Sequence, residues 1–146
     1  WLFVFSTRAA QAVFNVYLGF LSDGNSLWAR YANAIIISMA RTKFSYNGKP
    51  NRYALHDTGM AVANLLLQAL ALDVYVHQMG GFSREKVKEY FKLGDDIEPV
   101  AIMAVGYLGN DSSLSPELLK RDEKRRSRKS VNEFVFKNTL SDEAFK

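Results

Sequence analysis

The longest apolar stretch of the chain runs from Thr58 to Asp73 and predicts a helix with apolar residues on nearly every side. Only Thr58, Asn64, Gln68 and Asp73 are polar within it. A surface helix normally shows one apolar stripe, so this helix is expected to be covered on most of its faces. Burial at the centre of a large core would cover it, and so would packing against a second copy of the chain.

The polar residues of this helix have a regular spacing. Asp57, Ala61, Asn64 and Gln68 follow one another at four, three and four residues, so they share one line along the helix. Asn64 and Gln68 could satisfy buried backbone groups or cap a neighbouring loop, or they could contact a ligand. The first alternative is favoured because buried polar groups are normally paired.

Shorter patterns predict the remaining elements, which together indicate a layered α/β domain. Three isoleucines in succession, Ile35 to Ile37, favour a strand buried on both faces. Thr7, Ser83 and Ser115 are predicted N-caps, Gly94 is predicted to stop a helix, and SDGNS is predicted to be a turn. Strands are predicted over residues 2–7, 33–40 and 99–107, residues 74–79 alternate only weakly, and further helices are predicted over residues 7–21, 83–94 and from Ser115.

A polar segment, residues 42–53, separates the second strand from the long helix. It contains Phe44, Tyr46 and Tyr53 among polar and turn-forming residues. Such aromatic residues either pin a loop to the body of the protein or border a ligand pocket. The first alternative is the more common one.

Length and composition indicate one domain over residues 1–146 with a packed core, since 48% of the residues are hydrophobic. The absence of cysteine excludes disulfides, a thiol nucleophile and cysteine-ligated metals, and suits a cytoplasmic protein. The most apolar run contains Asn64, Gln68 and Asp73 and falls short of a clean membrane span. WLFVFS has no basic leader or cleavage site and is an implausible natural beginning, so we expect residues to precede Trp1.

The excess positive charge is confined to one segment. Residues 120–129 hold seven of the 19 basic and two of the 15 acidic residues, whereas the rest of the chain has a net charge of −1. Such a cluster can be a solvated surface, a nucleic-acid patch or a phosphate seat, and composition favours the first. His56 and His77 lack metal-ligand spacing and are interpreted as hydrogen-bonded structural residues. No Walker loop, G-x-G-x-x-G or nucleophile elbow is present.

Four motifs occur in the order and approximate spacing found in the FMN-dependent nitroreductase family. They are DTGMAVANLLLQALAL, HQMGGFSREKVKEYFKL, DIEPVAIMAVGYLG and RRSRKSVNEFVF. Together with LFVFST and GNSLWARYANAIIIS, they make nearly the whole chain resemble the C-terminal two thirds of that family. The family's N-terminal flavin-binding helices, with their arginine and serine, have no counterpart in this sequence.

The resemblance implies an α+β fold with a central mixed β-sheet flanked by helices, in an intertwined homodimer with FMN in the interface. The long apolar helix would then lie in the dimer core. The tail from Val131 would extend across the partner.

The resemblance also assigns cofactor-binding residues. Gln78, Met79, Gly80 and Gly81 match the segment whose backbone lies against the edge of the isoalloxazine ring, where glycine permits close approach of an N–H donor. The family often has an acidic residue at the place of Gly80. Arg126 and Arg128 match the basic-x-Arg pair that holds the FMN phosphate, a group suited to forked guanidinium donors.

The implied activity is hydride transfer from NADH or NADPH through FMN to nitroaromatic, quinone or similar electron-poor substrates. No side chain has to act as a general acid, and Arg30 and Lys43 are more simply surface cations than flavin ligands. One alternative is a flavin-binding regulatory protein without efficient turnover. Another, and a minor one, is a basic module that binds nucleic acid.

Overall fold

The computed structural model describes residues 1–109, 114–123 and 126–140. The chain forms two compact units, Trp1–Asn110 and Asp111–Lys146, and each is described by itself. Lys124, Arg125 and residues 141–146, which belong to the predicted basic cluster and tail, lie outside the described residues.

The first unit is built on a four-stranded sheet. Its strands are β1 (Leu2–Thr7), β2 (Ala34–Arg41), β3 (Tyr75–Met79) and β4 (Ile97–Gly106). Their order is β1-β2-β4-β3, and every neighbouring pair is antiparallel. The α+β fold is therefore confirmed, whereas the expectation of a mixed sheet is wrong for the described strands. The reason is that β4 lies between β2 and β3, which themselves run in the same direction.

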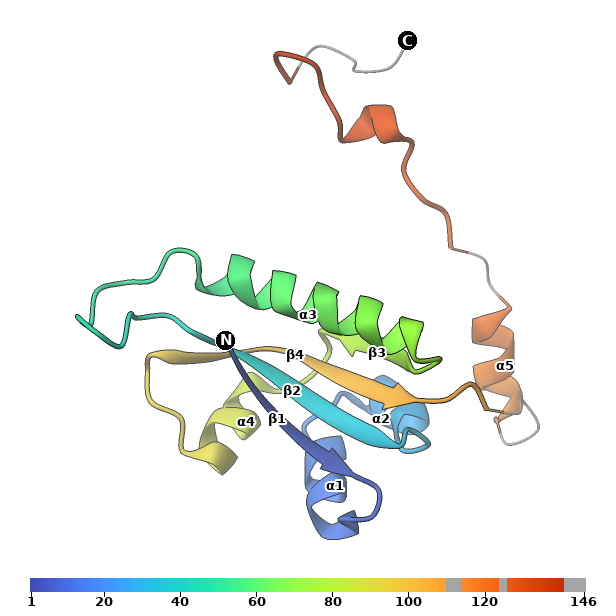
Figure 1. Ribbon diagram of the computed structural model, residues 1–146. Helices are drawn as coiled ribbons and strands as arrows, with labels where there is room; N and C mark the ends of the chain where they lie inside the picture. The colour runs from blue at the N-terminus through green and yellow to red at the C-terminus, as the bar shows by residue number, and fades with distance from the viewer. Residues whose placement is uncertain (110–113, 124–125, 141–146) are drawn as a thin grey trace. The chain divides into compact units, whose positions relative to one another are not determined.

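Helices cover both faces of this sheet (Figure 1). On one face lie α1 (Gln11–Leu18), α2 (Asp23–Ala29) and α4 (Arg84–Phe91). On the other lies α3 (Ala54–Ala71), which connects β2 to β3 and contacts both strands. Two separate apolar layers result, one on each side of β2 and β4.

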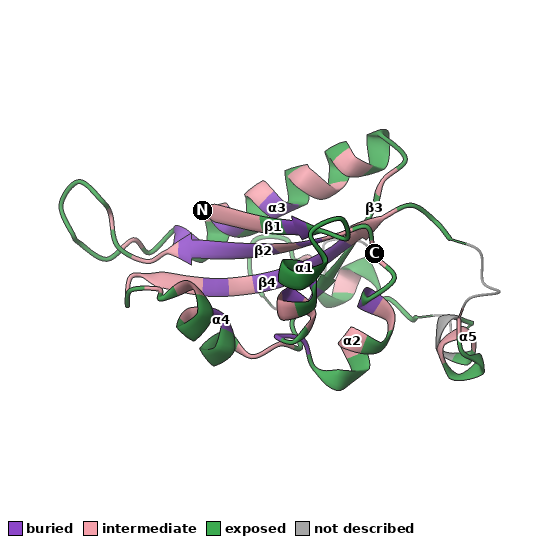
Figure 2. Ribbon diagram, turned by 90° about the horizontal axis from the view of Figure 1, so that it is seen from below, coloured by how far each residue is buried: buried purple, intermediate pink, exposed green. Residues whose placement is uncertain are grey.

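The main apolar cluster lies on the side of the sheet covered by α1, α2 and α4. Figure 2 shows the buried segments of β2 and β4 behind these helices. Ile37 on β2 and Ile102 on β4 pair across the strands, and both are fully buried. Phe14 of α1 and Val87 of α4 complete the contact. Because side chains alternate along a strand, Met103 faces the other way, beneath α3. The central strands are thus buried on both faces, as the isoleucine run predicts.

Helix α3 buries only a narrow line of residues within its own chain. Thr58 and Val62 are buried, and Thr58 Oγ1 donates a hydrogen bond to the Ala54 carbonyl oxygen at 2.7 Å. The outer side carries exposed apolar residues, among them Met60 at 55%, Leu67 at 67% and Leu70 at 56% exposure. The alternative that this helix lies at the centre of its own chain's core is therefore wrong.

The amides of α3 are not buried either. Asn64 and Gln68 are both exposed, next to the outer apolar residues. Within the described part of the single chain they therefore satisfy no buried backbone group, because this side of the helix faces away from the sheet.

Several predicted element ends differ from the observed ones. Thr7 ends β1 rather than capping a helix, since α1 begins only at Gln11. SDGNS forms most of α2, with Ser22 at the N-cap position and Asp23 suitably placed in the positive first turn. Helix α4 ends at Phe91 rather than at Gly94, and its C-cap Lys92 adopts the left-handed conformation with φ 50°. The Ser83 cap is confirmed, because its hydroxyl accepts from Lys86 N at 3.1 Å.

The second unit contains α5 (Pro116–Asp122) and a 3₁₀ turn (Val131–Glu133). The predicted Ser115 cap is confirmed, since its hydroxyl accepts from Leu118 N at 3.3 Å. A capping box at Ser130 and Glu133 orders the 3₁₀ turn, where the Glu133 carboxylate accepts from Ser130 N at 2.8 Å. Around it, apolar side chains are exposed: Val131, Phe134, Phe136 and Leu140.

Candidate functional site

The predicted flavin-edge segment begins at the end of the edge strand β3. Gln78 and Met79 point to opposite faces of the sheet, as neighbours in a strand do. Met79 is 2% exposed and packs in the core with Ile102, whereas Gln78 is exposed. Met79 can therefore offer a ligand only its backbone groups.

Gly81 is fixed by the start of α2. Its carbonyl oxygen accepts hydrogen bonds from Ser22 N at 2.9 Å and from Asn25 Nδ2 at 3.1 Å. A Cβ atom on Gly81 would lie 2.9 Å from Asn25 Nδ2 and 3.0 Å from Ser22 Oγ. The structure thus gives a reason for glycine at this position that involves no ligand: contact with α2.

Gly80 has different surroundings. It is exposed, and a Cβ atom placed on it would meet no atom within 4 Å. Its carbonyl oxygen accepts from Phe82 N at 3.2 Å, and Phe82 forms an isolated bridge with Leu21. Gly80 is therefore an exposed residue in a turn whose two flanking residues have fixed positions. Met79 is buried in the core, and Gly81 is hydrogen-bonded to α2.

Arg126 and Arg128 lie in the second unit, in the segment that precedes the capping box at Ser130. Both side chains are exposed. Arg128 Nη1 donates to the carbonyl oxygen of its neighbour Ser127 at 3.2 Å. Within the described parts of the chain neither arginine has a carboxylate partner, so both guanidinium groups can still bind an anion.

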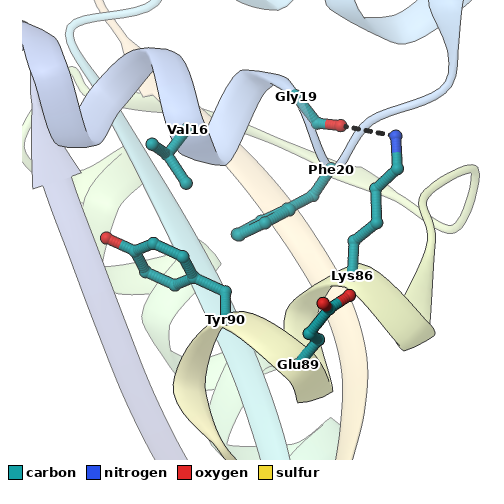
Figure 3. Close-up of a pocket in the computed structure, with 6 residues that line it drawn as sticks. All are labelled: Val16, Gly19, Phe20, Lys86, Glu89 and Tyr90. Carbon is teal, nitrogen blue, oxygen red and sulfur yellow. Dashed lines mark hydrogen bonds between the residues drawn. The ribbon is translucent and has the colours of Figure 1, made fainter.

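A pocket of about 320 Å³ lies between α1 and α4 (Figure 3). Phe20 and Tyr90, whose ring centroids are 5.6 Å apart, form its apolar wall. At its rim Lys86 Nζ donates to the Gly19 carbonyl oxygen at 3.4 Å. None of the predicted cofactor-binding residues lines it. Apart from the apolar face of α4, no sequence pattern predicts this pocket. The aromatic residues of the pocket chiefly join α4 to the end of α1.

Ionisable groups near this pocket are structural. Burial, with a smaller contribution from Tyr90, raises the pKa of Tyr17, so this phenol stays neutral and serves as a packing residue. Backbone and Ser83 hydrogen bonds lower the pKa of the Glu85 carboxyl at the start of α4. Among the described residues no group of three His, Asp or Glu side chains could hold a metal ion.

The two histidines have local partners. His56 Nδ1 lies 3.0 Å from Asp57 Oδ1 at the start of α3, where both side chains are exposed. The ring of His77 meets the Trp28 ring edge-on, with centroids 4.8 Å apart. These contacts agree with the structural roles expected for both residues.

Fold and sequence together define the class of protein. The Nitroreductase family matches residues 4–107, and this chain belongs to that family. Its class is that of an oxidoreductase. The matched range contains β2, β3, β4, most of β1 and the segment from Gln78 to Gly81, whereas Arg126 and Arg128 lie beyond it.

Individual relatives agree with this assignment. An uncharacterised 15.4 kDa protein of Mycolicibacterium smegmatis is 31% identical over 128 residues, which is 88% of this chain and 84% of the relative. A solved oxidoreductase containing FMN is 26% identical, with a TM-score of 0.87 over 97% of this chain and 72% of its own. A nitroreductase family protein from Clostridium difficile 630 shares the fold at 21% identity, with a TM-score of 0.65 over 95% of this chain and 74% of its own. No described helix is long and apolar enough to cross a bilayer.

Substitution of Gly80 and of Gly81 by alanine should affect the free energy of unfolding very differently. Gly81→Ala forces Asn25 or Ser22 to move, so we expect it to lower the free energy of unfolding by about 1–3 kcal/mol. Gly80→Ala meets open space and should change it by less than about 0.5 kcal/mol. Urea unfolding of both variants measures the difference, and equal stabilities would show that the contact of Gly81 with α2 is unimportant.

Proposed function

We propose that this protein is an FMN-dependent oxidoreductase that takes electrons from NADH or NADPH. The observation that carries the proposal is Gly80, which directly follows β3, is exposed and has no atom within 4 Å of the place where a Cβ atom would lie. This is the place where family resemblance predicts the edge of the flavin ring. The similarity to a solved oxidoreductase containing FMN supports it.

The residues present fit this cofactor. Gly80 leaves room for a flat ring, and its backbone N–H is the proposed donor at the ring edge, with Gln78 beside it. Arg126 and Arg128 are proposed to hold the phosphate, since neither has a carboxylate partner in the described residues. When bound, FMN supplies the capacity to accept a hydride and to pass electrons on.

The protein's own task is then binding and orientation rather than proton transfer. The clamp of Ser22 and Asn25 on the Gly81 carbonyl fixes the backbone next to Gly80, so a donor there keeps its direction. Electron-poor flat molecules such as nitroaromatics and quinones are the proposed acceptors in a ping-pong reaction. A cytoplasmic location stays a prediction.

We further propose that two copies of the chain associate through α3. Its exposed apolar residues Met60, Leu67 and Leu70 recur at a helical spacing on the side away from the sheet. An exposed apolar stripe of this length is unfavourable in water, and a second copy would cover it. Oligomers of one chain most often have such two-fold interfaces.

An absorbance scan tests the proposed function directly. Purified protein incubated with FMN and freed of excess should absorb in the blue, and NADH or NADPH added without oxygen should bleach that band. A yellow protein that neither nucleotide reduces would favour a flavin-binding protein without turnover. Failure to retain FMN would remove the proposal.

Removal of the two arginines tests the phosphate seat. Arg126→Ala with Arg128→Ala should weaken FMN binding, because each charge-assisted contact contributes about 1.5–3 kcal/mol. The control is Lys129→Ala with Lys137→Ala, which removes the same charge from exposed positions in the same unit. Equilibrium dialysis measures both, and equal FMN affinities in the two double variants would show that the arginines are misassigned.

A charge placed on α3 tests the association. Leu67→Arg should convert a dimer into a monomer, because an unpaired guanidinium would enter a dry seam. Leu27→Arg, at a residue of α2 that is 45% exposed, should leave the dimer intact. Sedimentation velocity distinguishes the two, and a wild-type monomer at micromolar concentration would contradict the proposed interface.

A further inference from the structure

Residues 42–53, here called the hairpin arm, connect β2 to α3 as a long loop that extends away from the sheet (Figure 1), and an isolated antiparallel bridge pairs Lys43 with Pro50. Phe44 N donates to the Lys49 carbonyl oxygen at 2.8 Å, and Asn51 N donates to the Thr42 carbonyl oxygen at 2.7 Å. Gly48 turns the chain with φ 70°. The arm is therefore an ordered structure rather than a loose loop.

The arm carries only positive charge. Lys43, Lys49 and Arg52 are its charged residues, all three are exposed, and none forms an ion pair with a described carboxylate. Arg41 at its base differs, since it is paired with Asp96. Three cations without internal partners are thus presented together on a projecting element.

An aromatic surface accompanies these cations. The rings of Phe44 and Tyr46 lie 5.3 Å apart, and Tyr46 is 78% exposed near the tip. The Phe44 ring packs against one side of the Tyr46 ring, and the exposed side of Tyr46 can stack on a heterocycle. A nucleobase next to a phosphate has both of the complementary features.

Sheet topology places the arm at the same end of the sheet as Gly80. Ile37 of β2 and Met79 of β3 both pair with Ile102, and the two strands run in the same direction. Gly80 follows Met79 at once, whereas β2 continues to Arg41 before the arm starts. Gly80 is therefore level with Ser38 of β2. The first residue of the arm, Thr42, lies about 13 Å beyond Gly80 along the strand direction, at about 3.3 Å per residue.

We propose that the hairpin arm binds the phosphorylated adenosine half of NADPH and so makes the protein prefer NADPH to NADH. The inference rests on the proposed function, because it takes Gly80 as the place of hydride transfer. NADPH differs from NADH by one phosphate, at the end of the molecule remote from the hydride-bearing ring. An arm that projects beyond Gly80 and presents cations beside an exposed ring matches that separation.

The surroundings favour a small ligand over a nucleic acid. Asp57 and Asp95 lie near the base of the arm, at the start of α3 and beside the Arg41–Asp96 pair. A long polyanion crossing the arm would approach these carboxylates, and three cations release few counterions. A single nucleotide needs only the outer part of the arm.

The test uses a triple variant, Lys43→Gln with Lys49→Gln and Arg52→Gln. Its matched control is Arg8→Gln with Lys86→Gln and Lys92→Gln, which removes the same charge from exposed positions outside the arm. Isothermal titration with 2′,5′-adenosine bisphosphate and with 5′-AMP measures binding without any flavin reaction. The KM values for NADPH and NADH give the second readout.

We expect wild type and the control to bind 2′,5′-adenosine bisphosphate more tightly than 5′-AMP. In the arm variant this affinity should fall about tenfold, the scale of several weak exposed ion pairs. The KM for NADPH should rise to the same extent while that for NADH stays within about twofold. Unchanged binding in the arm variant, a wild-type preference for NADH, or tighter binding of a single-stranded oligonucleotide would each overturn the inference. Failure of NADPH to reduce FMN would instead count against the proposed function, since the titration does not depend on it.

Discussion

The pairing of β2 with β4 is the interaction on which the rest of the structure depends. These two strands are the inner ones of the sheet, and their side chains supply both apolar layers. Ile35, Ile37 and Ile102 face α1 and α4, whereas Met103 and Ser38 face α3. Even the buried hydroxyl of Ser38 serves this pairing, since it donates to the Ala101 carbonyl oxygen at 3.1 Å and accepts from Ala101 N at 3.2 Å. These two hydrogen bonds join β2 to β4 directly before the register shift between Ser38 and Met39.

The same pairing determines where the turn at Gly80 and the hairpin arm lie. Because β4 lies between β2 and β3, the connection through α3 must cross it, and both flanking strands end at the same end of the sheet. The open backbone at Gly80 and the hairpin arm are consequences of that one topology. The start of α2 then fixes the turn after β3, because Ser22 N and Asn25 Nδ2 both donate hydrogen bonds to the Gly81 carbonyl oxygen. The two neighbouring glycines thus have separate roles. Gly81 allows α2 to approach the backbone, and Gly80 leaves open space at the surface.

The sequence predicted the elements well and their ends less well. Strands β1, β2 and β4 were predictable because each is a run rich in apolar or β-branched residues, and the isoleucines of β2 indicated burial on both faces. Strand β3 was not predicted as a strand, because its sequence alternates only weakly. Helix α2 was missed because Gly24 and Asn25 have low helix propensity, whereas hydrogen bonds from Ser22 N and Asn25 Nδ2 to the Gly81 carbonyl oxygen stabilise the start of the helix through tertiary structure. The paired antiparallel order was not predictable either, since no local pattern shows that β4 lies between β2 and β3. For the candidate site, the resemblance indicated the segment from Gln78 to Gly81, but only coordinates could distinguish Gly80 from Gly81.

The exposed side of α3 explains why its sequence was difficult to interpret. A helix that packs against a sheet on one side and is meant to stay in water on the other would carry charged residues there, yet Met60, Leu67 and Leu70 occupy that side. Asn64 and Gln68 accompany them, and neutral amides can be paired across an interface at far lower cost than charges can. The composition of this side is therefore that of an interface with a few polar contacts rather than that of a solvated surface. If two copies meet there, the helix becomes covered on most faces, and the missing amphipathic stripe in its sequence follows from assembly rather than from the fold of one chain.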